Sequence, residues 1–286
     1  MAEITATTVA KLRKMSGQGM MDCKKALTET GGDLDKAMEL LRKKGLATLA
    51  KRAGRDTTEG RVVCKISDDG KTAVIASLCS ETDFVAKSED FVAAAELLAE
   101  CGFKATADSG AESLLETHVN GRRFADVLTD TISKTGEKVE IGDYFRYVLN
   151  GSGTFGSYVH FNGKVGALLE VETDGDAVAQ AVQQTADEIA MHITAINPLG
   201  LDKDGIDPAV LDKERAIAAE QVKDKPANII DKIVEGKIGK FLKENCLLEQ
   251  PFVKDDSITV GQALANAAKA AGGQAKIKRF VRVEIG

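Results

Sequence analysis

Residues 62–79 carry the pattern that decides the fold. The apolar run Val62-Val63-Cys64-Lys65-Ile66 is followed by a turn signal, Asp69-Gly70-Lys71, and by a second run, Ala73-Val74-Ile75-Ala76-Ser77-Leu78-Cys79. Two such runs joined by an Asp-Gly turn predict a β-hairpin. A helix is predicted from about Ser88, because apolar residues then recur on one helical face at Phe91, Val92, Ala95, Leu98 and Ala99. The unit is therefore a hairpin followed by a helix.

A partial copy of this unit lies downstream. It runs from Ser157-Tyr158-Val159-His160-Phe161 through the turn Asn162-Gly163-Lys164 and Leu168-Leu169 to Glu172-Thr173-Asp174. A helix from about Asp176 to Ile196 follows. Both copies place Glu-Thr-Asp between the hairpin and the helix, so the sequence predicts a duplicated hairpin-helix core.

The link between the first hairpin and its helix is Ser80-Glu81-Thr82-Asp83-Phe84-Val85-Ala86-Lys87. Strand-to-helix junctions lie at the surface of a rigid scaffold, where binding residues are often placed. Phe84 either projects as a binding residue or packs on its own helix as a hydrophobic staple. The second copy has Gly175 at the corresponding position. Because the scaffold was repeated without the aromatic ring, we favour the first interpretation.

Charge is distributed unevenly along the chain. Residues 1–55 contain twelve Lys and Arg against six Asp and Glu, a net charge of +6, so the rest of the chain carries −12 within a total of −6. This argues against nucleic-acid binding by the whole surface and suggests that the N-terminal segment meets an acidic partner. A basic face that is simply solvated remains the alternative.

Residues 1–45 are predicted to form three short helices. Their expected spans are Thr7–Met15, Met20–Thr30 and Leu34–Lys44, with Gly45 ending the third. The arrangement resembles a ubiquitin-associated-type three-helix domain. Residues 51–58 are predicted to be a polar, mobile linker.

The rest of the chain completes an α+β fold. Further helices are predicted near 111–119, 124–134 and 260–271, and strands near 143–149 and 277–285, with Gln250-Pro251-Phe252-Val253 returning the chain to the sheet. Asp207-Pro208 starts a helix to about Lys223, and Pro226 starts another to about Asn245. This pair predicts an inserted antiparallel helical hairpin. The expected domains are 1–55, core subdomain N at 56–150, core subdomain C at 151–206 and 249–286, and the hairpin at 207–248.

Several function classes are disfavoured by the sequence. No apolar run approaches the length of a membrane span and no signal-peptide core is present, so we expect a cytoplasmic protein. Five scattered cysteines suggest reduced core thiols, and three distant histidines suggest no metal site or cofactor. Gly151-Ser152-Gly153-Thr154-Phe155-Gly156 matches a dinucleotide pattern, but a strand follows it instead of a helix, so we expect a glycine-rich turn. We expect a protein that is not an enzyme.

Taken together, the chain is similar to bacterial translation elongation factor Ts over nearly its whole length. The motifs that carry the resemblance are Leu12-Arg13, Gly19-Met20-Met21-Asp22-Cys23-Lys24-Lys25-Ala26-Leu27, Thr82-Asp83-Phe84-Val85, Gly156-Ser157-Tyr158, Ile189-Ala190-Met191-His192, Val234-Glu235-Gly236-Lys237 and Gln250-Pro251-Phe252-Val253. Some members carry a further helical tail, whereas this chain stops at Gly286. Contacts of such a tail fall outside the resemblance.

The resemblance implies a guanine-nucleotide exchange factor for elongation factor Tu. It implies that Thr82, Asp83, Phe84 and Val85 disturb the Mg²⁺ and phosphate site of that GTPase. Leu12, Met20 and Met21 would dock on another face of the partner, unless they belong to the core of their own helices. His160 would face another partner domain, and the helical hairpin would serve self-association, giving a homodimer, or partner contact. An adaptor that binds another helical partner through the ubiquitin-associated-like domain is the alternative function.

Overall fold

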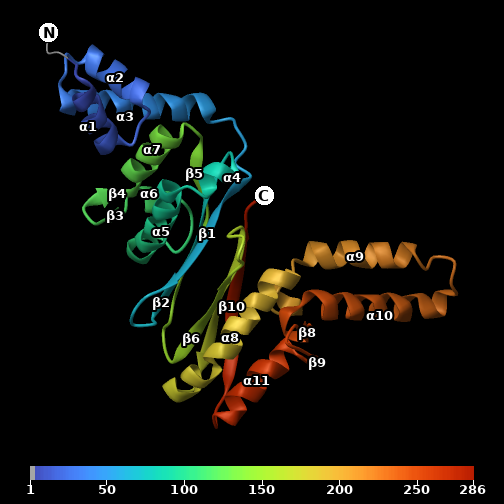
Figure 1. The fold of residues 1–286 in the computed structure, drawn as a ribbon. Coiled ribbons are helices and arrows are strands. Elements are labelled where there is room, and N and C mark those ends of the chain that lie inside the picture. The colour runs from blue at the N-terminus through green and yellow to red at the C-terminus, as the bar shows by residue number, and fades with distance from the viewer. Residues whose placement is uncertain (1–3) are drawn as a thin grey trace.

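The computed structural model describes residues 4–286, and the side chains of these except 46, 48–51, 227 and 228. Two three-stranded antiparallel sheets pack against each other, and helices cover the outer face of each (Figure 1). A group of three N-terminal helices lies at one end, and a pair of long helices projects from the side (Figure 1). The fold is therefore a mixed α and β arrangement with small antiparallel sheets.

The first sheet has the strand order β1-β2-β5. Its strands are β1 (Glu59–Ile66), β2 (Thr72–Ser80) and β5 (Val139–Val148), and the predicted Asp-Gly turn joins the first two, with Gly70 at φ 66°. Helices α5 (Glu89–Lys104) and α7 (Phe124–Thr135) cover its outer face. Ser88 is the residue before α5, as the sequence predicted.

The second sheet repeats this connectivity with the order β10-β7-β6. Its strands are β6 (Gly153–Val159), β7 (Val165–Thr173) and β10 (Ala275–Glu284), covered by α8 (Asp176–Ile196) and α11 (Val260–Ala270). In both sheets the third strand pairs antiparallel with the second strand of the hairpin. The predicted bounds of α8 are confirmed.

Strand β2 is buried on both faces, which explains why its residues from Ala73 to Cys79 are apolar except for Ser77, whose hydroxyl accepts the Asp143 backbone N–H. Val74, Ala76 and Leu78 face the helices, whereas Ala73 and Ile75 face the second sheet. A strand between a helix layer and a sheet has no solvated face, so neither set of alternating positions needs to be polar.

The glycine-rich segment is only partly a turn, contrary to expectation. Strand β6 already begins at Gly153, and Gly156 lies inside it. A Cβ on Gly156 would lie 2.2 Å from the carbonyl oxygen of Ala186 in α8. Gly156 therefore permits close packing of a helix on the strand, which is a structural use of a glycine.

Two other local predictions were wrong. The helix expected at 111–119 is a single turn, α6 (Glu112–Leu115), followed by a two-residue hairpin of β3 (His118–Val119) and β4 (Arg122–Arg123). Asn120 and Gly121 take positive φ between these strands, a turn that the Asn-Gly pair favours. The return at 250–253 does not join a large sheet, because β8 (Pro251–Phe252) pairs only with β9 (Asp255–Thr259).

The projecting helices are α9 (Pro208–Glu220) and α10 (Ala227–Asn245), which run side by side as predicted (Figure 1). Asp207 caps α9 by accepting the Ala209 backbone N–H at 2.9 Å. Short 3-10 turns, η1 (Lys203–Gly205) and η2 (Leu247–Glu249), lie at the base of the pair.

The N-terminal helices are α1 (Ala6–Ser16), α2 (Met20–Glu29) and α3 (Leu34–Arg52), which we call the head. The predicted end of α3 at Gly45 was wrong, because the helix continues for seven residues to Arg52. Gly45 packs against α7, where an added Cβ would overlap the Ser133 hydroxyl. The predicted mobile linker at 51–58 was also wrong in part, since Arg52 and Arg55 form ion pairs with the body.

Candidate functional site

The segment after β2 forms a short helical tip, α4 (Asp83–Ala86), between the strand and α5. Thr82 caps this turn by accepting the Val85 backbone N–H at 3.4 Å. The backbone N–H and hydroxyl of Thr82 also donate to the Glu137 carboxylate, at 3.0 and 2.7 Å. Ala86 is buried and Val85 packs against the core of the first sheet. Hydrogen bonds to Glu137 and the packing of Val85 and Ala86 therefore fix the turn on the first sheet and its helices.

Phe84 is the one tip residue whose side chain is left free by this arrangement. Its ring is 83% exposed, so it does not act as a hydrophobic staple. Exposure of a large apolar ring on a rigid turn is unfavourable in the isolated chain and suits a protein contact. In the second copy, Gly175 precedes α8 directly and no such turn is present.

Asp83 has a largely exposed side chain and forms an ion pair with Lys87, one helical turn away, at 2.6 Å. The hydrogen bond from Lys87 and its charge lower the pKa of Asp83. The carboxylate is therefore ionised at neutral pH. Because the ion pair is exposed, a partner can replace it at small cost.

The turn between β6 and β7 borders the same cavity as the tip. A groove of about 450 Å³ separates the two segments. It is lined by Glu59, Gly60, Arg61, Asp83, Ala86, Lys87, Phe161, Asn162 and Lys164. The structure thus brings the tip of the first hairpin-helix unit next to the hairpin turn of the second.

His160 lies at this turn, half-buried between two aromatic residues. Its Nδ1 lies 3.3 Å from the Tyr158 hydroxyl, and its ring centroid is 4.3 Å from that of Phe161. Phe161 is 92% exposed, and the sequence analysis did not single it out. The available signal was an aromatic residue directly before an Asn-Gly turn, where the turn itself needs no apolar side chain.

The head residues expected to bind a partner divide into two groups. Leu12 is fully buried in the core of the three helices, so the expectation that its side chain docks on a partner is corrected to a core role. Met20 and Met21 begin α2 and are 52% and 75% exposed. These two remain available for contact, and they lie outside the head's core.

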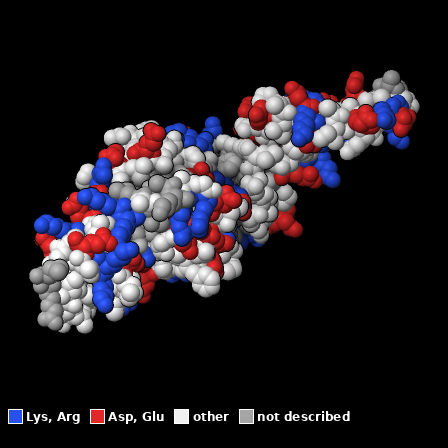
Figure 2. Space-filling view, turned by 90° about the horizontal axis from the view of Figure 1, so that it is seen from above, with Lys and Arg blue, Asp and Glu red and all other residues white. Residues whose placement is uncertain are grey.

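Charged side chains of both signs cover the visible face of the molecule. Lys and Arg are interspersed with Asp and Glu both at the end that carries the head and along the projecting helices (Figure 2). Among residues 4–286, no group of three or more His, Cys, Asp or Glu side chains is placed to hold a metal ion. Within the same range, none of the helices has the length and apolar character needed to cross a membrane.

Comparison with known proteins identifies the chain. A family model described as "Elongation factor TS" matches residues 81–286. Elongation factor Ts of Nitratiruptor sp. is 43% identical over 285 residues, which cover 99% of this chain and 93% of that protein. Elongation factor Ts of Clostridioides difficile is 43% identical over 289 residues, covering 100% of this chain and 94% of that protein. The chain belongs to the elongation factor Ts family. Membership implies a nucleotide-exchange role in translation elongation.

The match to the elongation factor Ts family begins at Glu81, so it contains the whole tip, α8 and the projecting helices. A buried histidine, His192, holds α8 against the segment that follows the projecting helices. His192 Nδ1 accepts the Val253 backbone N–H at 3.3 Å, so its Nε2 carries the proton and donates to Gln250 Oε1 at 2.9 Å. His192 therefore joins α8 to the segment that returns from the projecting helices, which is a structural role.

We expect His192 to stay neutral well below neutral pH. Burial lowers the pKa of His192 from 6.5, and its hydrogen bond with Gln250 opposes this only in part. Since the unfolded chain takes up the proton first as pH falls through about 6.5, folded stability should decrease on acidification below that value. An NMR titration, assigned with His192→Gln, should give a midpoint below 6.5. A midpoint above 6.5 would contradict the buried neutral form.

Proposed function

We propose that this chain binds GDP-bound elongation factor Tu and promotes GDP release by disturbing the Mg²⁺ and phosphate site. The observation that carries the proposal is the exposed Phe84 ring on a turn fixed by Thr82, Val85 and Glu137. In a chain of the elongation factor Ts family, a rigid apolar projection beside a carboxylate is suited to insertion between elements of a GTPase. No bond is made or broken in this process.

The energetic basis of exchange is a difference in affinity between two partner states. A GTPase holds GDP through Mg²⁺ and through backbone donors of its phosphate loop. The tip favours the open, nucleotide-poor state only to the extent that it binds that state more tightly. By linkage, GDP must lower the affinity of elongation factor Tu for this chain by the same factor by which this chain lowers its affinity for GDP.

We propose the following division of contacts. Phe84 supplies buried apolar area and Asp83 supplies charge near the shell of the partner's metal, while Thr82 and Val85 hold them in place. Met20 and Met21 on the head bind a second face, and His160 faces another partner domain. The projecting helices provide an arm for self-association or partner contact.

The proposed domain organisation accords with these contacts. It comprises a ubiquitin-associated-like domain with its linker at 1–55, core subdomain N at 56–150, core subdomain C at 151–206 and 249–286, and the helical hairpin at 207–248. We further propose that the two core subdomains are copies of one hairpin-helix unit. The site of action is the bacterial cytoplasm. No particular observation favours the alternative function as an adaptor, which would leave the tip unused.

The role of Asp83 gives a prediction with a matched control. Asp83→Ala should slow GDP release by about tenfold, the loss typical of one interaction with a charged group. Because the carboxylate acts on the metal step, the defect should shrink when EDTA removes Mg²⁺. Lys87→Ala breaks the same 2.6 Å ion pair but leaves the carboxylate, so it should keep most activity. Equal defects in both variants would assign the effect to tip structure.

The proposed function is tested by antagonism between the chain and GDP. Calorimetry with nucleotide-free elongation factor Tu should show tight binding, and saturating GDP with Mg²⁺ should weaken it by a large factor. Binding that is indifferent to GDP would show an adaptor, and absence of binding would refute the proposal.

A further inference from the structure

Glu81, the residue directly before the tip, is the centre of a charged cluster. Its carboxylate accepts Nη1 of Arg52 at 2.8 Å, Nη1 of Arg55 at 2.7 Å and the backbone N–H of Lys138 at 2.6 Å. The side chain is only 13% exposed, which shields these contacts from water. The mechanism proposed above uses none of these groups.

The cluster ties together segments that are distant in sequence. Arg52 ends α3, the last helix of the head, and Arg55 follows it in the connection to the body. Lys138 belongs to the loop after α7, and its Nζ donates to the Arg55 carbonyl oxygen at 3.0 Å. The adjacent Glu137 holds Thr82 of the tip. The end of the head and the base of the tip are therefore fastened at one point.

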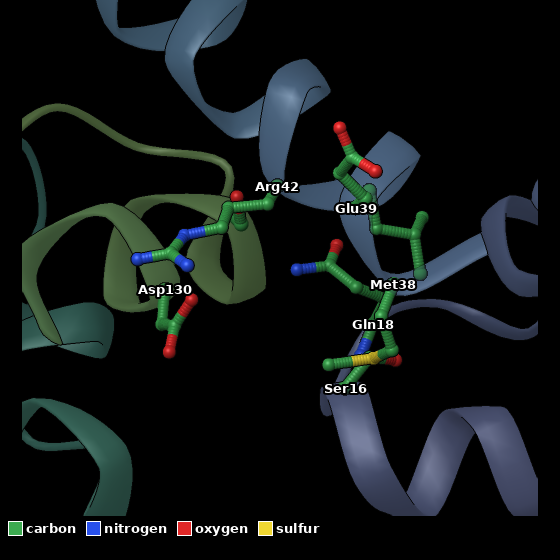
Figure 3. Close-up of a pocket in the computed structure, with 8 residues that line it drawn as sticks. Ser16, Gln18, Met38, Glu39, Arg42 and Asp130 are labelled. Carbon is green, nitrogen blue, oxygen red and sulfur yellow. The ribbon is translucent and has the colours of Figure 1, made fainter. Parts of the chain in front are cut away.

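Head and body also pack against each other along α3 and α7. Arg42 on α3 forms an ion pair with Asp126 of α7, and Gly45 rests on Ser133. A cavity of about 290 Å³ lies between the head and α7 beside these contacts (Figure 3). Arg42 and Asp130 lie on one side of it, and Gln18 and Met38 on the other (Figure 3). These contacts hold α3 through its middle turns, whereas the Glu81 cluster holds the end of α3 next to the tip.

We propose that Glu81 is a positioning residue that fixes the head relative to the tip through Arg52 and Arg55. The chain would then present its head and its tip to one partner molecule at a set spacing. This inference rests on the proposed exchange function, in which both parts contact elongation factor Tu. It assigns a task to a residue that neither the tip nor the head includes.

A head held at a fixed distance from the tip is expected to give tighter partner binding than a head on a mobile connection. Two contacts held in the bound geometry avoid the entropy cost of ordering the connection on binding. The Glu81 carboxylate is ionised under physiological conditions. Burial raises the pKa of Glu81, but the backbone N–H of Lys138 and the guanidinium groups of Arg55 and Arg52 outweigh it and lower the pKa to about 2.

The test separates positioning from support of the tip. Arg52→Gln with Arg55→Gln removes the link from the head side and leaves Glu81 bonded to Lys138. Glu81→Gln removes the charge from the tip side. Each should raise the concentration of chain that gives half-maximal GDP release by roughly tenfold and leave the maximal rate within about twofold. The triple variant should be no worse than either, because all three changes break one linkage.

A matched control removes two charges elsewhere. Lys269→Gln with Lys276→Gln alters exposed lysines in the last turn of α11 and near the start of β10, and should change neither quantity. The spacing itself is measured by spin labels at Lys11→Cys on the head and Lys104→Cys on the body, both exposed positions. The unsubstituted chain, labelled in parallel, reports any reaction of the half-buried Cys64.

We expect a narrow distance distribution that broadens in the Arg52→Gln, Arg55→Gln variant and in Glu81→Gln. A distribution that stays narrow, or an unchanged half-maximal concentration, would overturn the positioning role. If the unsubstituted chain fails to accelerate GDP release from elongation factor Tu, the exchange function is refuted. The distance measurement still decides whether Glu81 fixes the head.

Discussion

Phe84→Ala is expected to slow maximal GDP release from elongation factor Tu by roughly 10- to 150-fold, because burial of such a ring contributes about 1.5–3 kcal/mol. The ring is 83% exposed in the free chain, so its contact belongs to the complex. If that contact forms mainly in the open state, the loss appears in the maximal rate more than in initial docking. Stopped-flow release of a fluorescent GDP analogue measures both quantities.

The same substitution should have little effect on folding. Phe91→Ala is the matched control, since Phe91 lies seven residues away and is fully buried in the core of the first sheet. It should lose about 3–5 kcal/mol of unfolding free energy, the range for a core phenylalanine. Phe84→Ala should lose far less. A large drop in melting temperature with unchanged activity per folded molecule would show that Phe84 serves the fold.

Replacing Met20 and Met21 together by Ala is expected to weaken complex formation about 30-fold, at about 1 kcal/mol for each side chain. Both methionines are exposed at the start of α2, outside the core that holds Leu12. Because Ala is at least as good a helix former as Met, α2 itself should be preserved. Calorimetric titration against nucleotide-free elongation factor Tu measures the change in affinity.

Met15→Ala supplies the control for this pair. Met15 is 50% exposed and belongs to the same head, but it lies outside the proposed contact. Its substitution should leave affinity unchanged. A loss equal to that of the Met20 and Met21 variant would indicate a diffuse effect of exposed methionines, and no loss in either would give the head another function.

The elements that local sequence specifies were predicted well. The Asp-Gly and Asn-Gly turns, the bounds of α8 and the Asp207-Pro208 start of α9 all depend on patterns within a few residues. The junction after β2 was likewise expected to expose Phe84, and the repeat supplied the reason. Comparison of the two copies showed which residue the scaffold does not require.

Features that depend on long-range packing were missed. Gly45 looked like the end of a helix, since glycine commonly follows one, but its small size serves the contact with Ser133 of α7. The linker looked mobile because its charges have no local partners, whereas Arg52 and Arg55 find Glu81 across 29 and 26 residues. Phe161 was overlooked because its significance depends on the groove it shares with Asp83.

The central claim is that the tip of this chain accelerates GDP release from elongation factor Tu. The most direct measurement is the rate of that release at saturating chain and physiological Mg²⁺, compared with the spontaneous rate. We predict a large acceleration by the unsubstituted chain that is mostly lost in Phe84→Ala while complex formation persists. A release rate equal to the spontaneous one, or an acceleration that Phe84→Ala leaves unchanged, would contradict the account.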